Sequence, residues 1–227
     1  MDEHRAIVRR ACLAALAVSA ALLLGAVLML IRRHGSDADW TVLGRVVGHR
    51  GALLVDASRV VTQAGVLWVL VLVAAAAALP IWRAVGLRAA CVPMVALLVA
   101  SLAAQVLKAW FGRVRPPLAL REVTTSGWAF PSGHATNAAA LFVSVSLVMV
   151  ATLARSRRQR VVLIVAGSLA VLLVGSSRLV LGVHWPSDVL AGWALGTAVA
   201  SAVTFVGLHP LRSAVPVPSS ESRTPTD

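Results

Sequence analysis

Residues 133–153 read GHATNAAALFVSVSLVMVATL, a run without Asp, Glu, Lys or Arg that is long enough to cross a lipid bilayer as a helix. Five more apolar runs of about twenty residues accompany it along the chain. The predicted spans are 11–31, 60–79, 89–107, 133–153, 161–176 and 189–208. This pattern predicts an all-α polytopic membrane protein whose six transmembrane helices form a bundle.

The composition agrees with a membrane protein and excludes other classes. Of the 227 residues, 59% are hydrophobic and only 13% are charged, too few charges to cover a soluble domain. Cys12 and Cys91 lie inside apolar runs as small hydrophobic residues, which excludes a disulfide scaffold. The net charge of +12 could indicate a nucleic-acid partner, but the basic residues lie at the ends of apolar runs. We therefore expect membrane lipids, and no nucleic acid, as their partners.

The distribution of arginine predicts the orientation of the chain. An even number of spans places both termini on one side of the membrane. Arginines precede the first span and follow the second and fourth spans, at positions 5, 9, 10, 83, 88, 155, 157, 158 and 160. Because short cytoplasmic loops are rich in Arg and Lys, we expect cytoplasmic termini. The opposite face is also basic, in 32–59, in 108–121 and at Arg178, which conflicts with this rule unless some of these residues have another function.

Three segments at the ends of the spans receive separate predictions. The first apolar run is too long for the core of a cleaved signal peptide, so we expect it to remain as a span. Residues 35–59 are polar enough to lie outside the bilayer, where a short interfacial helix could be anchored by Trp40. Residues 215–227 are rich in Pro, Ser and Thr and are predicted to be disordered, which leaves 1–214 as one membrane domain.

Three polar clusters beside the spans require an explanation, because an ionisable side chain in hydrocarbon costs about 2.5–3.5 kcal/mol. They are Lys108–Pro117, Phe130–Asn137 and Ser177–Asp188. With six spans, all three clusters fall on the same face of the membrane, opposite the termini. They therefore predict one strongly cationic site, whose natural ligand is a multiply charged anion.

The basic and small residues of these clusters are suited to phosphate. Arg115 and Arg178 carry planar guanidinium groups that can bind two oxygens at once, and Lys108 supplies a point charge. Ser132 is a candidate N-cap, and Gly133 permits close approach of the backbone to an anion at the helix N-terminus. The alternative for Ser132 and Gly133 is ordinary helix capping without a ligand.

His184 and Asp188 are candidates for nucleophilic catalysis. Four residues separate them, and Pro186 indicates that a helix begins between them. The carboxylate can then hold one ring nitrogen and present the other for attack. The alternative is an interfacial histidine beside an aspartate that stabilises the helix N-terminus.

His134 has no acid near it in sequence and lies among the groups expected to bind phosphate, which favours the role of general acid toward a leaving oxygen. Two histidines could alternatively hold a metal. The one clear carboxylate is already paired with His184, and at least three cations lie nearby. No metal site is therefore expected.

Together the clusters resemble the signature of the type 2 phosphatidic acid phosphatase superfamily. Its three parts are matched, in order and without substitution, by Lys108-x6-Arg115-Pro116, Pro131-Ser132-Gly133-His134 and Ser177-Arg178-x5-His184-x3-Asp188. Each part alone is a modest signal, but the ordered set on one membrane face is specific. Arg113, two residues before Arg115, belongs to no required position of the signature.

The resemblance implies a role for each matched residue. His184 attacks phosphorus to give a phosphohistidine, and Asp188 orients and charges this histidine. His134 protonates the leaving group and then helps to activate water. The phosphoryl oxygens are held by Lys108, Arg115, Ser132, Gly133 and Arg178. The resemblance implies no metal and no other cofactor.

The apolar spans argue against the soluble branches of the superfamily, and a site at the bilayer surface favours a lipid phosphate. Undecaprenyl pyrophosphate, phosphatidylglycerol phosphate and phosphatidic acid are the expected substrates. Trp110, Trp128 and Trp185 flank the clusters as interfacial anchors. The expectation is a metal-independent lipid phosphatase of the bacterial inner membrane with an extracytoplasmic active site. Phosphoryl transfer to another acceptor, and lipid-phosphate transport without catalysis, are the alternatives.

Overall fold

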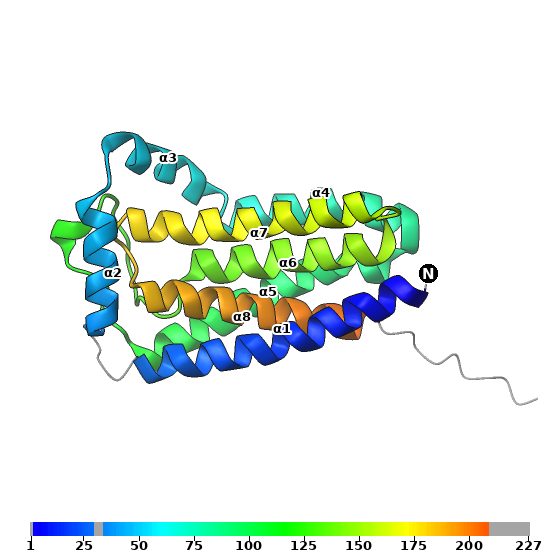
Figure 1. Cartoon of the computed structure of the whole chain (residues 1–227), viewed down its shortest axis with the longest axis horizontal. Coiled ribbons are helices and arrows are strands. Elements are labelled where there is room, and N and C mark those ends of the chain that lie inside the picture. Colours follow the sequence, from blue (N-terminus) through cyan, green and yellow to red (C-terminus); the bar gives the residue numbers. More distant parts are fainter. Residues whose placement is uncertain (1, 30–33, 209–227) are drawn as a thin grey trace, which may run out of the picture.

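The computed structural model describes residues 2–29 and 34–208, and all regular structure within these two ranges is helical (Figure 1). The helices are α1 (Asp2–Met29), α2 (Asp37–Gly48), α3 (Ala52–Gln63), α4 (Leu67–Val85), α5 (Leu87–Phe111), the 3-10 turn η1 (Leu118–Leu120), α6 (Gly133–Thr152), α7 (Arg157–Val180) and α8 (Pro186–Gly207). The all-α prediction is confirmed for this part of the chain.

Five of the described helices, α4 to α8, are long and apolar enough to cross a membrane. Their outer faces expose large apolar side chains such as Trp68, Leu72, Leu98, Leu102 and Leu173, as expected for surfaces in contact with lipid. α1 lies along α8 in the same bundle (Figure 1) but is not among the five. The sixth span therefore stays a prediction.

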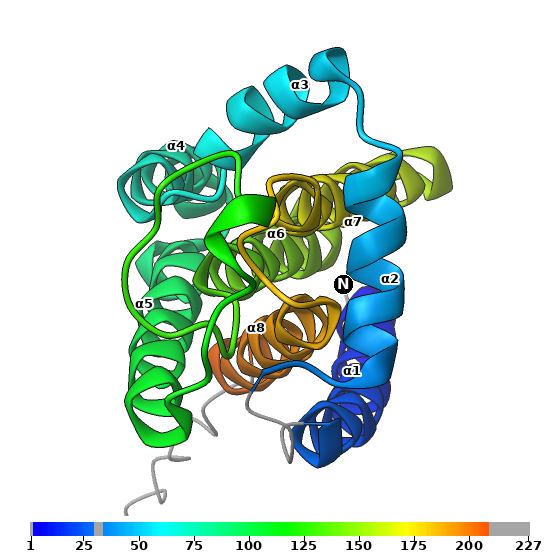
Figure 2. The ribbon, with the colours of Figure 1, turned by 90° about the vertical axis from the view of Figure 1, so that its left-hand side faces the viewer.

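α6 is the central helix, because it contacts α1, α4, α5, α7 and α8 (Figure 2). Its alanines are fully buried, and small residues let the neighbouring backbone approach closely. A Cβ at Gly192 of α8 would lie 2.8 Å from the Ser132 carbonyl oxygen, and one at Gly196 would lie 2.2 Å from that of Thr136. The Gly192-x3-Gly196 spacing thus sets the distance between α6 and α8 next to the polar clusters.

The second predicted span, 60–79, is wrong at both ends. Val60 is exposed on α3, a separate helix, and α4 runs from Leu67 to Val85 after a turn. α3 packs against α7 with Val55, Ser58 and Thr62 buried, so the apolar residues at its end belong to an amphipathic helix outside the span. α4 continues through Pro80, which transmembrane helices tolerate.

The first predicted span, 11–31, begins nine residues after the start of α1 at Asp2, and its predicted end lies outside the described residues. The boundaries of the third to sixth spans agree with the prediction to within four residues, and two differences affect the site. α7 extends beyond the predicted 161–176 at both ends and begins with a capping box formed by Ser156 and Gln159. Its last turn therefore contains Ser177 and Arg178, which were expected between spans. Lys108 likewise belongs to the last turn of α5. Both cations are consequently held by helices.

Residues 35–59 form most of two helices, where one short helix was expected. α2 crosses the end of the bundle and α3 lies obliquely beside it (Figures 1 and 2). Ser36 caps α2 by accepting the Asp39 N–H, and the Asp39 carboxylate accepts the Ser36 N–H in return. The expected anchor Trp40 is 43% exposed and donates its indole N–H to the His34 carbonyl at 3.1 Å.

The two ends of the bundle differ as the arginine pattern predicts. The start of α1, the junction of α4 and α5, and the junction of α6 and α7 lie at the end opposite α2 (Figure 1). These are the elements that carry the arginines assigned to the cytoplasmic face. Residues 215–227, for which disorder was predicted, lie outside the described residues. Residues 209–214, the last of the predicted 1–214 domain, lie outside them as well.

Candidate active site

The three polar clusters meet at one end of the bundle, as predicted. α5 and α7 end there, while α6 and α8 begin there, and the loops between these helices lie beside α2 and α3 (Figure 2). The backbone joins two of the clusters directly, because the Ser132 N–H donates to the Asp188 carbonyl at 3.0 Å. A single site therefore forms from residues up to 80 positions apart, from Lys108 to Asp188.

His184 and Asp188, the pair predicted for nucleophilic catalysis, lie next to each other. Asp188 lies in the first turn of α8, after Pro186 at the start of the helix, and His184 precedes the helix. The His184 Nδ1 is 3.4 Å from Asp188 Oδ2, which is long for a hydrogen bond but lies within the range of catalytic pairs without substrate. The same oxygen accepts the backbone N–H of Trp185 at 2.9 Å, which holds the carboxylate in place.

The tautomer of His184 follows from its second neighbour. Arg115 Nη1 lies 3.1 Å from His184 Nε2, and a guanidinium can only donate. Nε2 must therefore accept, so the neutral ring carries its proton on Nδ1 and donates it to Asp188. In this tautomer Nε2 carries a lone pair and no proton.

The surroundings of His184 keep the ring neutral. Its side chain is 3% exposed, and burial is the largest cause that lowers its pKa well below the ordinary value. The positive charge of Arg115 lowers this pKa further, as do the other basic groups of the site, Lys108, Arg178 and His134.

Arg115 and Lys108 lie in the site, but most of their donors contact the protein. Arg115 donates to the carbonyls of Val183 at 2.8 Å, Gly127 at 3.0 Å, Ser126 at 3.1 Å and Trp128 at 3.4 Å, and its fifth donor contacts His184. Lys108 Nζ donates to the Trp128 carbonyl at 2.8 Å. These contacts fix loop 112–132 over the site.

Ser132 and Arg178 have buried polar atoms that are available to a ligand. Ser132 is the N-cap residue of α6, but its side chain makes no capping hydrogen bond, so ordinary capping does not explain it. Its Oγ and the Arg178 Nε are buried without a hydrogen-bond partner among the described residues. Because such atoms are costly, they mark the position where an anion can bind, beside the N-terminus of α6.

His134 lies in the first turn of α6 and is packed against the turn that connects α3 to α4. A Cβ at Gly65 would lie 2.8 Å from Cδ2 and 3.1 Å from Cβ of His134. Gly65 therefore lets the turn contact the imidazole directly. Gly133, the neighbour of His134, lies near Lys108, whose Cε would be 3.8 Å from a Cβ added there.

Arg113, to which the sequence assigned no defined role, forms ion pairs with two buried carboxylates. Its side chain is 1% exposed, and its Nη1 donates to Asp188 Oδ1 at 2.5 Å. Its Nη2 donates to Asp39 Oδ2 at 2.6 Å, from α2. Sequence reasoning missed both roles; the signals that could have indicated them are the charge of Arg113 beside a span and the Ser36-x-x-Asp39 capping pattern.

The carboxylate of Asp39 is ionised in this environment. Burial alone would raise its pKa, but hydrogen bonds from the N–H groups of Ser187 and Ser36, together with the charge of Arg113, outweigh it. The net effect places the pKa of Asp39 below its ordinary value.

The prediction of three interfacial tryptophans is wrong for Trp185. Trp110 and Trp128 are 82% and 48% exposed, but Trp185 is only 1% exposed. Its indole N–H donates to the Val114 carbonyl at 2.9 Å, and its ring packs edge-on against Trp40 at 4.8 Å between centroids. Trp185 is therefore part of the core beneath the site, because α2 covers it.

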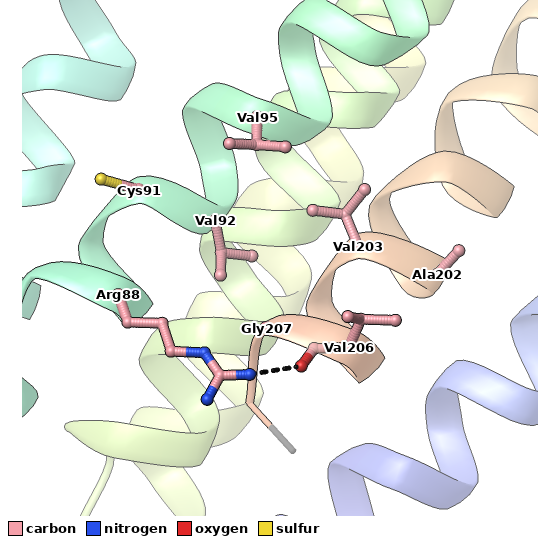
Figure 3. Close-up of a pocket in the computed structure, with 8 residues that line it drawn as sticks. All are labelled: Arg88, Cys91, Val92, Val95, Ala202, Val203, Val206 and Gly207. Atoms are coloured by element: carbon pink, nitrogen blue, oxygen red, sulfur yellow. Dashed lines mark hydrogen bonds between the residues drawn. The ribbon is translucent and has the colours of Figure 1, made fainter. Parts of the chain in front are cut away.

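A cavity of about 440 Å³ at the opposite end of the bundle lacks comparable chemistry (Figure 3). It lies between α5 and α8 and is lined by Arg88, Cys91, Val92, Val95, Ala202, Val203, Val206 and Gly207. Arg88 donates to the Val206 carbonyl at 3.2 Å. No histidine or carboxylate lines this cavity, so the reactive groups belong to the other end.

Metal ligands do not gather in the described part of the chain. No group of three or more His, Cys, Asp or Glu side chains is arranged there to hold an ion. At the site, one carboxylate oxygen of Asp188 faces His184 and the other faces Arg113.

The fold and the site define a helical membrane protein with a cluster of cationic side chains and two histidines at one end of its bundle. The sequence pattern of the PAP2 superfamily matches residues 89–208, from α5 to the end of α8. The chain therefore belongs to the PAP2 superfamily.

Two curated proteins and one solved structure are similar to this chain. A phosphatidylglycerophosphatase B of Bacillus subtilis is 46% identical over 40% of this chain and 45% of its own length. An undecaprenyl-diphosphatase of Sulfolobus acidocaldarius is 34% identical over 46% of this chain and 48% of its own length. The matches thus span about half the length of these relatives.

The crystal structure of a transmembrane PAP2-type phosphatidylglycerolphosphate phosphatase from Bacillus subtilis superposes with a TM-score of 0.73 at 26% identity. The superposition covers 82% of this chain and 93% of that one. The likeness therefore includes elements that lie outside residues 89–208.

Proposed function

We propose that this protein is a membrane phosphatase that hydrolyses the phosphoester or pyrophosphate bond of a lipid through a phosphohistidine on His184. The observation that carries the proposal is the arrangement of His184 between Asp188 and Arg115, which fixes the tautomer with a free electron pair on Nε2. The names of the relatives, phosphatidylglycerophosphatase and undecaprenyl-diphosphatase, support this reaction class.

In the first step, Nε2 of His184 attacks phosphorus, and the bond from phosphorus to the leaving oxygen breaks. His134 donates a proton to that oxygen, which leaves as the lipid alcohol or, from a pyrophosphate, as the lipid monophosphate. Asp188 accepts the Nδ1–H bond and stabilises the positive charge that develops on the ring.

The anionic oxygens of the phosphoryl group bind to the cationic side of the site. Ser132 Oγ, Arg178 Nε and the free N–H groups at the start of α6 contribute donors that are not engaged elsewhere. Arg115 turns from His184 Nε2 onto the phosphoryl group, which frees the nucleophile as the substrate binds. Lys108 adds a further positive charge beside Gly133.

In the second step, water attacks the phosphohistidine and inorganic phosphate is released. His134 now accepts the proton of the water, so the same group serves as acid and then as base. No step of this sequence requires a metal or another cofactor. Phosphatidylglycerol phosphate, undecaprenyl pyrophosphate and phosphatidic acid are the proposed substrates.

The proposed location is the inner membrane of a bacterium, with six spans, cytoplasmic termini and the site on the extracytoplasmic face. α1 supplies the sixth span, because it lies along α8 in the bundle. The arginines at the end opposite the site support the orientation. Exposed Trp110 and Trp128 support a position of the site at the membrane surface.

The test is phosphate release by the purified protein from a panel of lipid monophosphates and pyrophosphates, in the presence of EDTA. We expect activity that survives chelation and is abolished in His184→Ala, with full activity in the control His49→Ala, which changes the exposed C-cap residue of α2. Full activity in His184→Ala would refute the nucleophile, and complete loss in EDTA would indicate a metal enzyme. A phosphorylated acceptor in place of inorganic phosphate would indicate a transferase, and transport without turnover would indicate a carrier.

A further inference from the structure

A buried chain of charges connects α2 to the proposed nucleophile. Asp39 Oδ2 accepts from Arg113 Nη2 at 2.6 Å, and Arg113 Nη1 donates to Asp188 Oδ1 at 2.5 Å. The other oxygen of Asp188 faces His184 Nδ1. The side chains of Asp39, Arg113 and Asp188 are each at most 1% exposed. The connection is therefore shielded from water along its whole length.

The charges of this chain do not cancel. Arg113 carries one positive charge and contacts two carboxylates, so the three side chains together carry one negative charge. Without Asp39, Arg113 would neutralise Asp188 and weaken its attraction for a positive imidazole. With Asp39, the cluster faces His184 with a net negative charge, while the other charged neighbours of His184 are cations.

Asp39 also holds the first turn of α8 in position. Its Oδ1 accepts the backbone N–H of Ser187 at 2.9 Å and the Ser187 hydroxyl at 2.8 Å. The same hydroxyl accepts a hydrogen bond from Arg113 Nη1 at 2.7 Å. Ser187 precedes Asp188, so these contacts define where the Asp188 carboxylate lies relative to the ring of His184.

We propose that Asp39 and Arg113 are positioning residues that keep the Asp188 carboxylate aligned for the reaction of His184. This inference rests on the proposed roles of His184 and Asp188. It makes α2, which lies outside the matched residues 89–208, a working part of the active site. Structural support alone is a weaker explanation, because buried ion pairs contribute little net stability compared with apolar residues of the same volume.

Asp39→Asn is the primary test, because it removes the charge and keeps the shape of the side chain. We expect kcat to fall about 10- to 100-fold, as it does for other residues that orient a catalytic group. KM and the inhibition constant of inorganic phosphate should stay within about twofold, since Asp39 does not contact the phosphate donors. The matched control is Asp56→Asn, which changes an exposed aspartate of α3 that pairs with Arg59.

A double-mutant cycle shows whether Asp39 acts through Asp188. In the Asp188→Asn background, Asp39→Asn should cause no further loss of kcat, because the group that it positions has already lost its charge. Equal fold-losses in both backgrounds would overturn the proposal, as would an unchanged kcat in the single variant. Full activity of His184→Ala or Asp188→Asn is a different result, which would refute the proposed function itself.

Ser187→Ala keeps the inference testable if Asp39→Asn does not yield folded protein, as measured by thermal unfolding in detergent. This variant removes the hydroxyl that both Asp39 and Arg113 contact but leaves every charge in place. We expect kcat to fall about two- to tenfold at unchanged KM. An unchanged kcat, or a loss confined to KM, would overturn the positioning role.

Discussion

Segments 36–66 and 108–188 meet at the same end of the bundle but use their polar groups differently. In 108–188, Ser132 Oγ and Arg178 Nε are buried without partners among the described residues. In 36–66, the polar side chains that reach the site are engaged with protein: Asp39 binds Arg113 and Ser187, and Thr62 Oγ1 accepts from Arg178 Nη1 at 2.6 Å.

For Ser132 and Arg178 on one side, and Asp39 and Thr62 on the other, this difference is consistent with the proposed roles of binding a ligand and of orienting the residues that bind it. A buried polar atom without a partner costs free energy, so it persists where a ligand can satisfy it. A residue whose bonds are complete within the protein can influence the reaction only through its neighbours. Substitutions in 108–188 should therefore have large effects, and those in 36–66 smaller ones.

After the loss of activity expected for His184→Ala, the largest effect is expected for Arg178→Met, which removes a proposed donor to the phosphoryl group and keeps most of the side-chain volume. Loss of one such donor lowers kcat about 100- to 1000-fold. Phosphate release from lipid vesicles measures the change, with the exposed Arg45→Met on α2 as control. A loss of less than about tenfold would remove Arg178 from the anion-binding site.

Gly65→Ala should have the next largest effect, although Gly65 lies in segment 36–66, which contains no residue of the signature. The new methyl group would lie 2.6 Å from Val174 Cγ1 and 2.8 Å from His134 Cδ2, so the turn or the imidazole has to move. Because a small misplacement of a catalytic group is costly, we expect kcat to fall about 10- to 100-fold.

Gly48→Ala is the control for this substitution, since a Cβ at Gly48 meets nothing within 4 Å. Circular dichroism and thermal unfolding should show that both variants fold. Wild-type kcat in folded Gly65→Ala would show that the contact with His134 does not position the general acid.

Thr62→Val should have a smaller effect. It removes the hydrogen bond to Arg178 Nη1 but keeps the shape of the side chain, so the guanidinium keeps its charge and loses only its orientation. We expect kcat/KM to fall about two- to tenfold. Thr41→Val, which removes an exposed hydroxyl that donates to the Asp37 carbonyl at 2.8 Å, should leave kcat/KM unchanged. Equal losses of kcat/KM in Thr62→Val and Thr41→Val would contradict the idea that Thr62 of α3 orients the Arg178 guanidinium.

The smallest expected effect is the response of the wild type to mild acid. An ordinary histidine gains a proton as the pH falls through about 6.5, and this would block Nε2. Burial and the charge of Arg115 lower the pKa of His184, so its protonation moves to a more acidic pH. Between pH 7.5 and 6, the titration of His184 should therefore change kcat/KM by less than about twofold. A decline in kcat/KM that is complete by pH 6, and that protonation of the substrate phosphate does not account for, would contradict the lowered pKa of His184.

Much of the fold could be predicted from the sequence, because apolar runs of membrane-spanning length form helices wherever they lie. The fourth span was accurate to one residue at its end. The prediction of the second span was wrong because Val60 and Val61 are apolar and lie only a few residues before the next apolar run in the sequence. In the structure they end α3, whose packing against α7 separates it from α4.

The site was predictable to the extent that its residues carry their own chemical signal. His134, His184 and the cations around them contain reactive or anion-binding groups in a spacing that resembles a known signature. Arg113 and Asp39 gave no comparable signal, because their significance lies in a contact across 74 positions of the chain. Trp185 was misplaced for the same reason, since its burial depends on α2.

The sequence by itself determined that the chain forms apolar helices and that a set of cations, two histidines and an aspartate lies at one end of them. These properties depend on residue type and on local periodicity, which act within one segment. Only the tertiary structure decided that α2, α3 and the turn after α3 contact this set, through Asp39, Thr62 and Gly65 respectively. Hydrogen bonds and close contacts depend on ångström-scale distances between distant segments, and packing alone creates those distances.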